Sequence, residues 1–380
     1  MQRNSLGPPI AVGRTAELFP WGERHVLKLF HPWVPYSDIA LERNNSVAAR
    51  ALGVATPAVL DVVKHANRYG LVFERVEGPT LLEKLLAEPQ PLEQWAHQFA
   101  ELHLALHRIH HAVSSTPNSP EDTLEDALED TLGDLLEDSL EDSLEDSLEH
   151  PRNDSHGHDR VDCRESLDEP PDGSLDDSLG ALRGASRGAS RGTSLDDSIY
   201  DKSVVTSLRG SSGAPRAAPP TRDLANQPLP DQHRKLAHKI RHARQLTPQE
   251  RAAVLDLLLG LPKGNVLCHG DFHPGNIIMT ANQPVIIDWV DGTIGNPIAD
   301  VARSSIVLLG HIESGGVDED LKAMVKSFHQ LYLQHYMAAV SNRRHEYEQW
   351  LVVCAAARLS EGVEGQEQWL LHWVRKWLLR

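Results

Sequence analysis

Three polar residues in the second half of the chain have the types and the spacing that phosphoryl transfer requires. Asp271 and Asn276 lie five positions apart in the segment LCHGDFHPGN, residues 267–276, which is expected to be a loop. Asp288 follows twelve positions later, after the apolar residues 285–287, which are expected to form a strand. Phosphoryl transfer needs a carboxylate that orients the attacking hydroxyl, and oxygen ligands that hold Mg²⁺ against the phosphates. One aspartate, one asparagine and a second aspartate after a strand supply both.

Two other interpretations of this segment are weaker. An aspartate and an asparagine that only shape a turn before a hairpin would not need these identities together with this gap to Asp288. The run GDFH at residues 270–273 also points toward metallophosphoesterases. That chemistry needs further Asp and His clusters, such as a Gly-Asn-His triplet, and the chain contains none.

The pattern HGDFHPGN followed by IIDW at residues 286–289 resembles the aminoglycoside phosphotransferase and choline kinase-like family. These are small-molecule kinases with a protein kinase-like fold, and His-Gly-Asp stands where protein kinases usually have His-Arg-Asp. The resemblance implies transfer of the γ-phosphate of ATP to a hydroxyl group, with ATP and Mg²⁺ as cofactors. It implies that Asp271 accepts a hydrogen bond from this hydroxyl and takes its proton, and that Asn276 and Asp288 hold the metal.

The N-terminal residues are expected to position the nucleotide. Alternation and turn residues predict strands at 10–12, 17–19 and 25–30, joined by turns at 13–16 and 20–24. The resemblance implies that the first turn, with Gly13 and Thr15, covers the phosphates and that Lys28 pairs with them. A lysine on a strand is otherwise most often a solvated edge charge.

Two further segments are expected to complete the nucleotide site. A helix is predicted at 37–52, with Ser37 or Asp38 as its cap and Gly53 after its end. Its Glu42 either pairs with Lys28, as the resemblance implies, or faces water. Residues 70–78 are predicted to be a strand followed by a turn, and the resemblance makes this the link between lobes, where Glu74 and Val76 contact the nucleotide.

The rest of the folded sequence is expected to be mostly helical. Helices are predicted at 80–86, 91–111, 232–244, 248–260, 298–309, 319–340 and 345–379, with Thr247 as one cap and a strand at 266–268. In the helix at 298–309, Asp300 matches a family position that braces the catalytic loop. The helix at 91–111 carries four histidines at positions that could bind a metal, but no Glu or Cys in its sequence completes a ligand set: His103, His107, His110 and His111.

Residues 113–227 interrupt this pattern with low-complexity sequence. Leucine recurs every four residues from Leu124 to Leu148, a period that drifts around a helix and forms no coiled-coil seam. Residues 121–230 contain 27 acidic and 10 basic side chains, which accounts for the whole net charge of −17. We predict that this acidic insert is disordered. A protein partner for it is conceivable, but nothing in the sequence supports one.

Bulk composition excludes several classes of function. The balanced charge outside the insert gives no indication of nucleic-acid binding. Three scattered cysteines predict neither a disulfide framework nor a zinc site, and they favour a reducing, cytoplasmic location. No apolar run predicts a signal peptide or a membrane span.

The sequence therefore predicts an α+β chain with a bilobal protein kinase-like fold. Its parts are a small β-rich N-lobe at 1–78, the start of a helical C-lobe at 79–112, the insert, and the remaining C-lobe at 228–380. The acceptor is expected to be a small molecule, aminoglycoside- or choline-like, and a cationic acceptor would need clustered acids or aromatic faces. Acidic residues that could serve are Glu361, Glu364, Glu367 and residues 318–320. The alternatives are a nucleotide-binding pseudokinase or scaffold whose insert recruits a partner, and a histidine-rich metal-binding protein.

Overall fold

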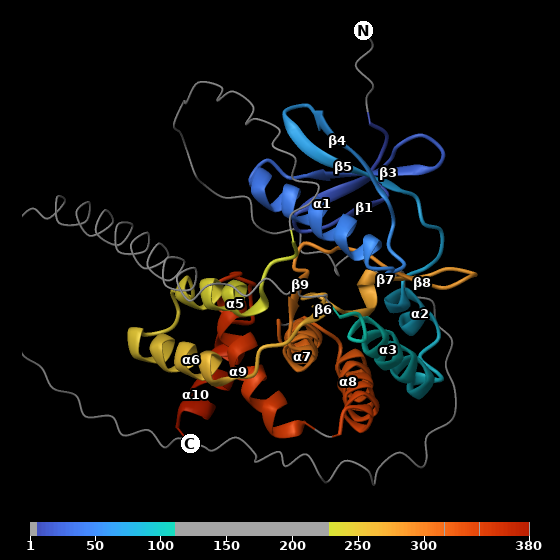
Figure 1. Ribbon diagram of the computed structural model, residues 1–380. Helices are drawn as coiled ribbons and strands as arrows, with labels where there is room; N and C mark the ends of the chain where they lie inside the picture. Colours follow the sequence, from blue (N-terminus) through green and yellow to red (C-terminus); the bar gives the residue numbers. More distant parts are fainter. Residues whose placement is uncertain (1–5, 111–227, 315, 342, 380) are drawn as a thin grey trace, which may run out of the picture. The chain divides into compact units, whose positions relative to one another are not determined.

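A five-stranded antiparallel sheet forms the N-terminal part of the computed structural model, which describes residues 6–110, 228–314, 316–341 and 343–379. The strands are β1 (Ala11–Val12), β2 (Ala16–Pro20), β3 (His25–Phe30), β4 (Val59–His65) and β5 (Arg68–Glu74). Their spatial order is β1-β2-β3-β5-β4 (Figure 1). The three strands predicted before residue 31 are confirmed, whereas β4 was not predicted.

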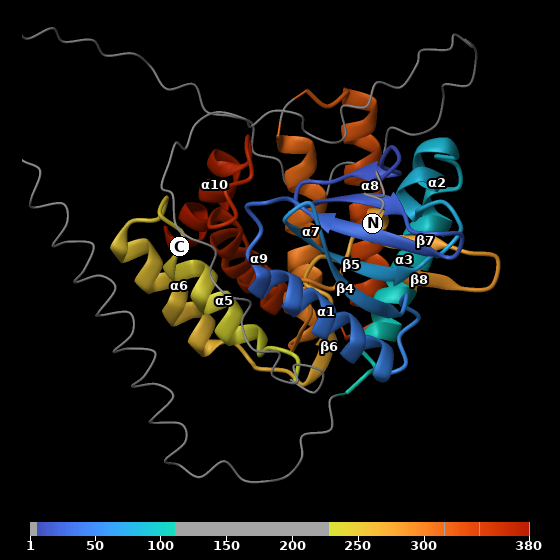
Figure 2. The same cartoon turned by 90° about the horizontal axis from the view of Figure 1, so that it is seen from above.

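Helix α1 (Tyr36–Ala51) packs on one face of this sheet (Figures 1 and 2). Because side chains alternate along β3, Leu27 and Leu29 point to the opposite face, and Lys28 and Phe30 point toward α1. The predicted cap was wrong, since the helix starts after Pro35, whose carbonyl accepts the first helical hydrogen bonds.

Two short hairpin-like pairs of strands lie between the sheet and the helices. Strand β6 (Val266–Cys268) pairs with β9 (Thr293–Gly295), and β7 (Ile277–Met279) pairs with β8 (Pro284–Ile286). The predicted strand at 266–268 is confirmed. The β6–β9 pair joins the two ends of the segment that contains Asp271, Asn276 and Asp288, and the β7–β8 hairpin lies within it.

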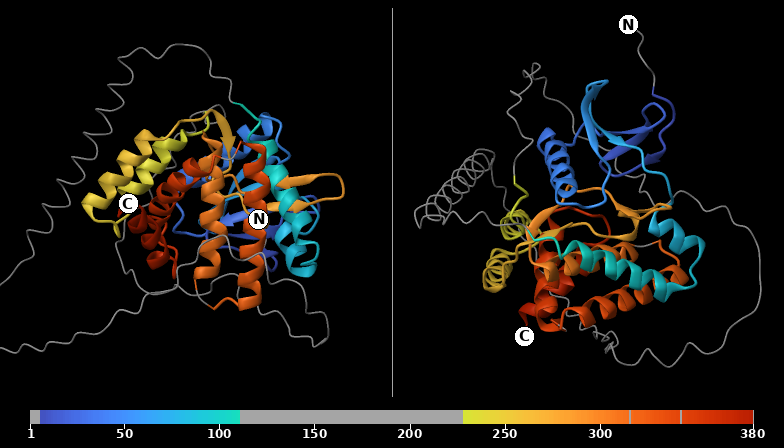
Figure 3. Two further views of the ribbon diagram at one scale, coloured as in Figure 1. Left: turned by 90° about the horizontal axis from the view of Figure 1, so that it is seen from below. Right: turned by 45° about the vertical axis from the view of Figure 1, so that its right-hand side comes forward.

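The remaining described elements are helices. Helix α2 (Leu81–Ala87) starts at a capping box on Thr80, and α6 (Pro248–Gly260) starts at another on Thr247, the residue that was predicted as its cap. Helix α5 (Gln232–Arg241) packs with α6 against α9 (Arg344–Leu359), and Figure 3 shows this pair in yellow beside the red C-terminal helices. The others are α3 (Leu92–Leu106), α7 (Pro297–Glu313), α8 (Glu319–Ala339) and α10 (Glu367–Leu378).

Two predicted helices are shorter than expected. Helix α3 ends at Leu106 because the following residues pair with β6: Leu267 donates to the Ile109 carbonyl, and His110 bridges to Val266. The region 345–379 is divided into α9 and α10, because Gly362 and Gly365 take positive φ angles of 58° and 75°.

The described residues belong to one compact unit, and their largest apolar core lies among the helices. The predicted α+β architecture, a sheet-rich N-terminal part followed by a mostly helical part, is confirmed. The boundaries assigned to the lobes remain predictions. The acidic insert lies outside the described residues, and so does His111. Within the described part of the chain, no helix has the length and apolarity of a membrane span.

Candidate active site

The segment between β6 and β7 is held in place by His269. This buried imidazole accepts a hydrogen bond from the Asp271 backbone N–H at Nδ1, 3.2 Å away. Its proton therefore lies on Nε2, which donates to the Ile287 carbonyl at 3.0 Å. Burial lowers the pKa of His269, so the ring stays neutral and keeps this tautomer. The loop that carries Asp271 is thus tied to the segment that carries Asp288.

Asp271 lies at the centre of the site with two side chains aimed at it. The Asn276 Nδ2 group donates to the Asp271 carbonyl at 3.0 Å and to its carboxylate at 3.3 Å. His273 Nε2 lies 3.5 Å from the same carboxylate, while its Nδ1 accepts from the Gly275 N–H. Burial alone would raise the pKa of Asp271, but His273 and Arg303 outweigh it and hold the pKa below its usual value. The carboxylate is therefore ionised and ready to accept a hydrogen bond.

Lys28 connects the N-terminal sheet to Asp288, 260 positions away in the sequence. Its Nζ lies 2.7 Å from Glu42 on α1 and 3.1 Å from Asp288. Burial would lower the pKa of Lys28, but the two carboxylates raise it above its usual value. Burial also raises the pKa of Glu42, which is almost fully enclosed. The predicted pairing of Lys28 with Glu42 is present.

Asp288 has a backbone conformation that aspartate rarely adopts, with φ of 65°. The residues after it are fixed from α1, because Asn45 Nδ2 donates to the Trp289 carbonyl at 2.9 Å and the Gly292 carbonyl at 3.1 Å. Trp289 is buried, and its indole N–H donates to Thr56 Oγ1. Such strain persists where surrounding contacts over-determine it, as is common at functional sites.

Asp300 on α7 braces the loop from below. Its buried carboxylate accepts from the backbone N–H groups of His269 at 2.7 Å and Gly270 at 2.8 Å. It also accepts from the Nε2 atoms of His103 and His107, each at 3.1 Å. Burial would raise the pKa of Asp300, but the two imidazoles hold it well below its usual value.

The histidines of α3 are therefore partners of a carboxylate that the sequence did not place beside them. His103 and His107 bind Asp300 through one nitrogen, and Tyr332 and Tyr336 through the other, at 2.8 and 2.7 Å. The ring nitrogens of His103 and His107 and a carboxylate oxygen of Asp300 lie within 4.8 Å of one another, a spacing that a metal ion could bridge. Because the hydrogen bonds account for both nitrogens of each ring, the geometry favours a structural network. His110 is exposed and lies apart from it.

The remaining residues that were predicted to contact the nucleotide lie on the N-terminal sheet and its connections. Gly13 closes the β1–β2 turn, with its N–H donating to the Ala16 carbonyl at 2.8 Å. The Thr15 carbonyl accepts from His31 N–H. Glu74 ends β5 and is half exposed, and Val76 is half-buried in the connection to α2. Their contacts with a nucleotide remain predictions.

The donor set fits a magnesium ion beside phosphates. Asn276 uses its Nδ2 group within the loop, which leaves its amide oxygen as a ligand. Asp288 contacts Lys28 through Oδ1 and retains its second carboxylate oxygen. One carboxylate and one neutral oxygen, completed by water and phosphate oxygens, is a set that Mg²⁺ favours.

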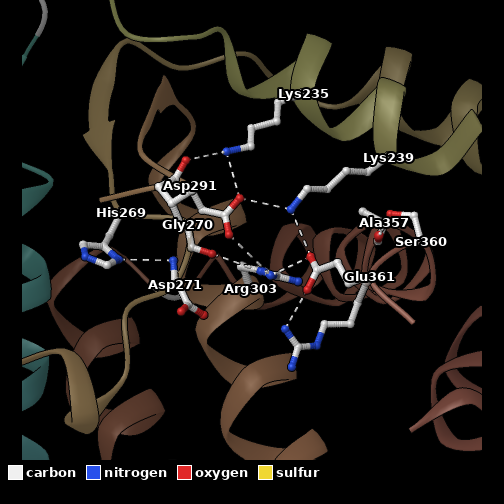
Figure 4. Close-up of polar contacts among 12 residues, drawn as sticks. Lys235, Lys239, His269, Gly270, Asp271, Asp291, Arg303, Ala357, Ser360 and Glu361 are labelled. Atoms are coloured by element: carbon white, nitrogen blue, oxygen red, sulfur yellow. Dashed lines mark hydrogen bonds and ion pairs between the residues drawn. The ribbon is translucent and has the colours of Figure 1, made fainter. Parts of the chain in front are cut away.

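A group of charged residues next to the loop was not predicted as a site. Figure 4 shows that Arg303 of α7 reaches Gly270, where its Nε donates to the carbonyl at 3.0 Å. Asp291 and Glu361 lie beside this guanidinium, and Lys235 and Lys239 reach down from α5. These residues come from separate parts of the sequence, and no local motif marks them.

The comparisons with known proteins agree with the predicted family resemblance. Residues 208–337 match the model of the phosphotransferase enzyme family, a range that contains Asp271, Asn276, Asp288 and Asp300. This match confirms the predicted resemblance. No curated protein matches the chain significantly.

Several solved structures of aminoglycoside phosphotransferases are similar to the chain at low identity. The streptomycin–ATP complex of APH(2")-IIa is 14% identical, with 99% of this chain and 92% of that chain covered and a TM-score of 0.42. A type VIII aminoglycoside-3'-phosphotransferase is 12% identical, with 94% and 92% covered and a TM-score of 0.44. APH(3'')-Id from Streptomyces rimosus is 13% identical, with 92% of each chain covered and a TM-score of 0.39.

Proposed function

We propose that this protein transfers the γ-phosphate of ATP to a hydroxyl group of a small molecule. The observation that carries the proposal is the ion pair of Lys28 with Asp288, which joins the sheet to the segment after Asp271 at 3.1 Å. A cation for phosphates, a carboxylate for a metal and a carboxylate for a hydroxyl thus belong to one site. The family match to phosphotransferases supports the same reaction class.

In this proposal each residue acts by position and charge. The Asp271 carboxylate, ionised because its pKa is low, accepts the hydrogen bond of the acceptor hydroxyl. It takes the proton late, as the new P–O bond forms and the bond between the γ-phosphorus and the departing ADP breaks. Lys28, held by Glu42, neutralises phosphate oxygens, and the turn with Gly13 and Thr15 covers them. Asn276 and Asp288 would hold magnesium, which would supply positive charge to the phosphates. Asp300 accepts hydrogen bonds from the loop N–H groups of His269 and Gly270 and so fixes the position of Asp271.

The test is ATP consumption by the full chain with a panel of hydroxylated metabolites and aminoglycosides. Asp271→Asn serves as the blank, because it keeps the shape of the side chain and removes the base. We expect turnover to fall by about 10²- to 10⁴-fold while nucleotide affinity stays within a few-fold of wild type. Wild-type nucleotide binding without turnover on any acceptor would instead favour the pseudokinase alternative.

A further inference from the structure

A cluster of four cations and two carboxylates lies on the helical side of Asp271. Asp291 is shared by Lys235 at 2.8 Å, Lys239 at 3.1 Å and Arg303 at 4.0 Å. Glu361 is shared by Lys239 at 2.9 Å, Arg303 at 2.7 Å and Arg358 at 2.8 Å. We call this group the basic cluster: Lys235, Lys239, Arg303, Arg358, Asp291 and Glu361.

The basic cluster borders the reaction space. Arg303 donates to the carbonyl of Gly270, the residue before Asp271. Arg303 and Arg358 both interact electrostatically with the Asp271 carboxylate, and Arg303 lowers its pKa. Arg14, in the turn proposed to cover the phosphates, donates to the Glu361 carbonyl at 3.3 Å. The cluster therefore touches both the catalytic loop and the phosphate-covering turn.

The basic cluster is also accessible. The side chains of Lys235 and Lys239 are 20% and 21% exposed. A cavity of about 40 Å³, which is room for a water-sized polar group, lies beside these lysines and is also lined by Gly270, Asp291, Asp300 and Arg303. The two ammonium groups therefore border both solvent and an internal cavity.

The charges in the basic cluster do not balance. Four cations share two carboxylates within the cluster, and the Asp271 carboxylate beside Arg303 and Arg358 offsets one of the two remaining positive charges. Burial lowers the pKa of Lys235 most, and Lys239 and Arg303 lower it further against Asp291. Burial would lower the pKa of Lys239 as well, but Asp291 and Glu361 raise it above its usual value. In a partly desolvated place, an unmatched positive charge attracts an anion and repels a cation strongly.

This charge balance speaks against the cationic acceptor that the sequence suggested. Glu361, a candidate for binding a cation, is already paired with three cations. Glu364 and Glu367 are exposed and have no part in the cluster. A polyammonium compound placed against Asp271 would therefore meet the positive side chains of the cluster. The carboxylates Asp291 and Glu361 that could attract it are already paired with these side chains.

We propose that the acceptor is an alcohol that also carries a phosphate or carboxylate group, and that Lys235 and Lys239 bind this group while Asp271 binds the hydroxyl. The inference rests on the proposed function, because it assigns the substrate class of the same site. It commits to the charge of the acceptor and leaves its carbon skeleton open.

Direct binding tests the charge of the ligand independently of turnover. The full chain is saturated with Mg²⁺ and a non-hydrolysable ATP analogue, which occupies the nucleotide site, and titrated calorimetrically. The probes are glycerol 3-phosphate, glycerate, glycerol and ethanolamine, which share a short hydroxylated skeleton. We expect the two anions to bind at least tenfold more tightly than glycerol or ethanolamine. Equal affinity for glycerol and glycerol 3-phosphate, or preference for ethanolamine, overturns the inference.

Variants assign the binding to the basic cluster. Lys235→Met should weaken glycerol 3-phosphate binding by roughly tenfold and leave nucleotide affinity unchanged. Lys239→Met is the second variant, and a melting curve for each confirms folding. Lys326→Met on the exposed face of α8 is the matched control and should bind as wild type does. Anion binding that survives in both folded cluster variants overturns the assignment.

A turnover arm separates this inference from the proposed function. ATP consumption with phosphorylated or carboxylated alcohols, and none with kanamycin, supports both. Turnover with kanamycin and none with the anionic alcohols overturns the inference and keeps the phosphotransferase. Tight, cluster-dependent anion binding with no turnover on any alcohol supports the anion site and overturns the proposed function.

Discussion

The two sides of Asp271 have opposite charge imbalances. On the sheet side, one cation, Lys28, contacts two carboxylates, Glu42 and Asp288. On the helical side, four cations share Asp291 and Glu361. Ion pairs alone would not need this asymmetry, because a structural network is most stable when its charges match. The asymmetry suits ligands of opposite sign, a divalent metal on the sheet side and an anionic group on the helical side.

The two sides also differ in how they are joined to the loop. The sheet side connects through side chains, since Lys28 reaches Asp288 and Asn276 reaches Asp271. The helical side connects through backbone, since Arg303 binds the Gly270 carbonyl and Asp300 binds the Gly270 N–H. We therefore expect variants on the sheet side to change ligand affinity most, and variants at the backbone contacts to change loop geometry.

Among the variants that compare the two sides, Asp288→Asn should have the largest effect. The substitution removes a full negative charge from the proposed metal site, whereas Asn276→Ala removes only a neutral oxygen. We expect Mg²⁺-dependent nucleotide affinity to fall roughly 100-fold in Asp288→Asn, about 2.7 kcal/mol, and less in Asn276→Ala. A Mg²⁺ titration of nucleotide binding measures both. Lys235→Met, on the opposite side, is the matched comparison and should show the same Mg²⁺ dependence of nucleotide binding as wild type. The same Mg²⁺ dependence in Asp288→Asn, Asn276→Ala and Lys235→Met would contradict the distinction between the two sides.

Gly270→Ala should have the next largest effect, because this residue lies where the two sides meet. Its φ is 76°, and an added Cβ would overlap the Asp291 carbonyl oxygen. Left-handed backbone strain and overpacking together predict a loss of roughly 2 kcal/mol in the free energy of unfolding. Denaturant titration checks it. Gly260→Ala, where a Cβ meets nothing within 4 Å, is the control and should be neutral or slightly stabilising.

Arg303→Lys should separate the position of the loop from the charge of the basic cluster. Lysine keeps the positive charge but loses the Nε–H that binds Gly270 together with the separate guanidinium nitrogen that contacts Glu361. We expect kcat to fall roughly tenfold, about 1.4 kcal/mol, with nucleotide affinity and melting temperature close to wild type. Arg344→Lys, at the exposed first residue of α9, provides the control. If nucleotide affinity and kcat fall together, Arg303 has a general structural role instead.

The sequence predicted the sheet side better than the helical side, and the reason is physical. Asp271, Asn276 and Asp288 belong to one contiguous motif, and Lys28 and Glu42 lie on a strand and a helix whose periodicity is clear. The basic cluster is assembled from α5, the β8–β9 connection, α7 and the end of α9, and each of its charges resembles a solvated helix face or turn.

Errors in the fold have a similar origin in tertiary contacts. Strand β4 was missed because its sequence, VLDVVKH, does not alternate cleanly, and its pairing with β5 contains an irregular register. Helix α3 was predicted too long because the residues after Leu106 have helical character but pair with β6 instead. Asp300 joins His103 and His107 across about 195 positions, and only the folded chain brings them together.

A last expected effect, on acid sensitivity, arises away from both sides of the site. His329 on α8 has a buried Nε2 that lacks a hydrogen-bond partner among the described residues, and burial lowers its pKa to about 4. In the unfolded chain His329 binds a proton near pH 6.5, whereas in the folded chain it does so only near pH 4. Between these values the unfolded state holds more protons, so stability falls as the pH drops.

For this one histidine we expect a loss of roughly 1 to 2 kcal/mol of unfolding free energy between pH 7 and pH 5. Denaturant titrations of wild type and His329→Leu at the two pH values measure it, and the variant should lose that much less on acidification. A substitution in the site would change both stability and ligand binding. His329 faces neither the proposed metal nor the proposed anionic group, so its substitution reports on stability alone. Burial likewise lowers the pKa of His103, His233, His269 and His311, so the variant should keep part of the acid sensitivity. Equal losses in both proteins would show that His329 is solvated and that the acid sensitivity originates in the site network around Asp300.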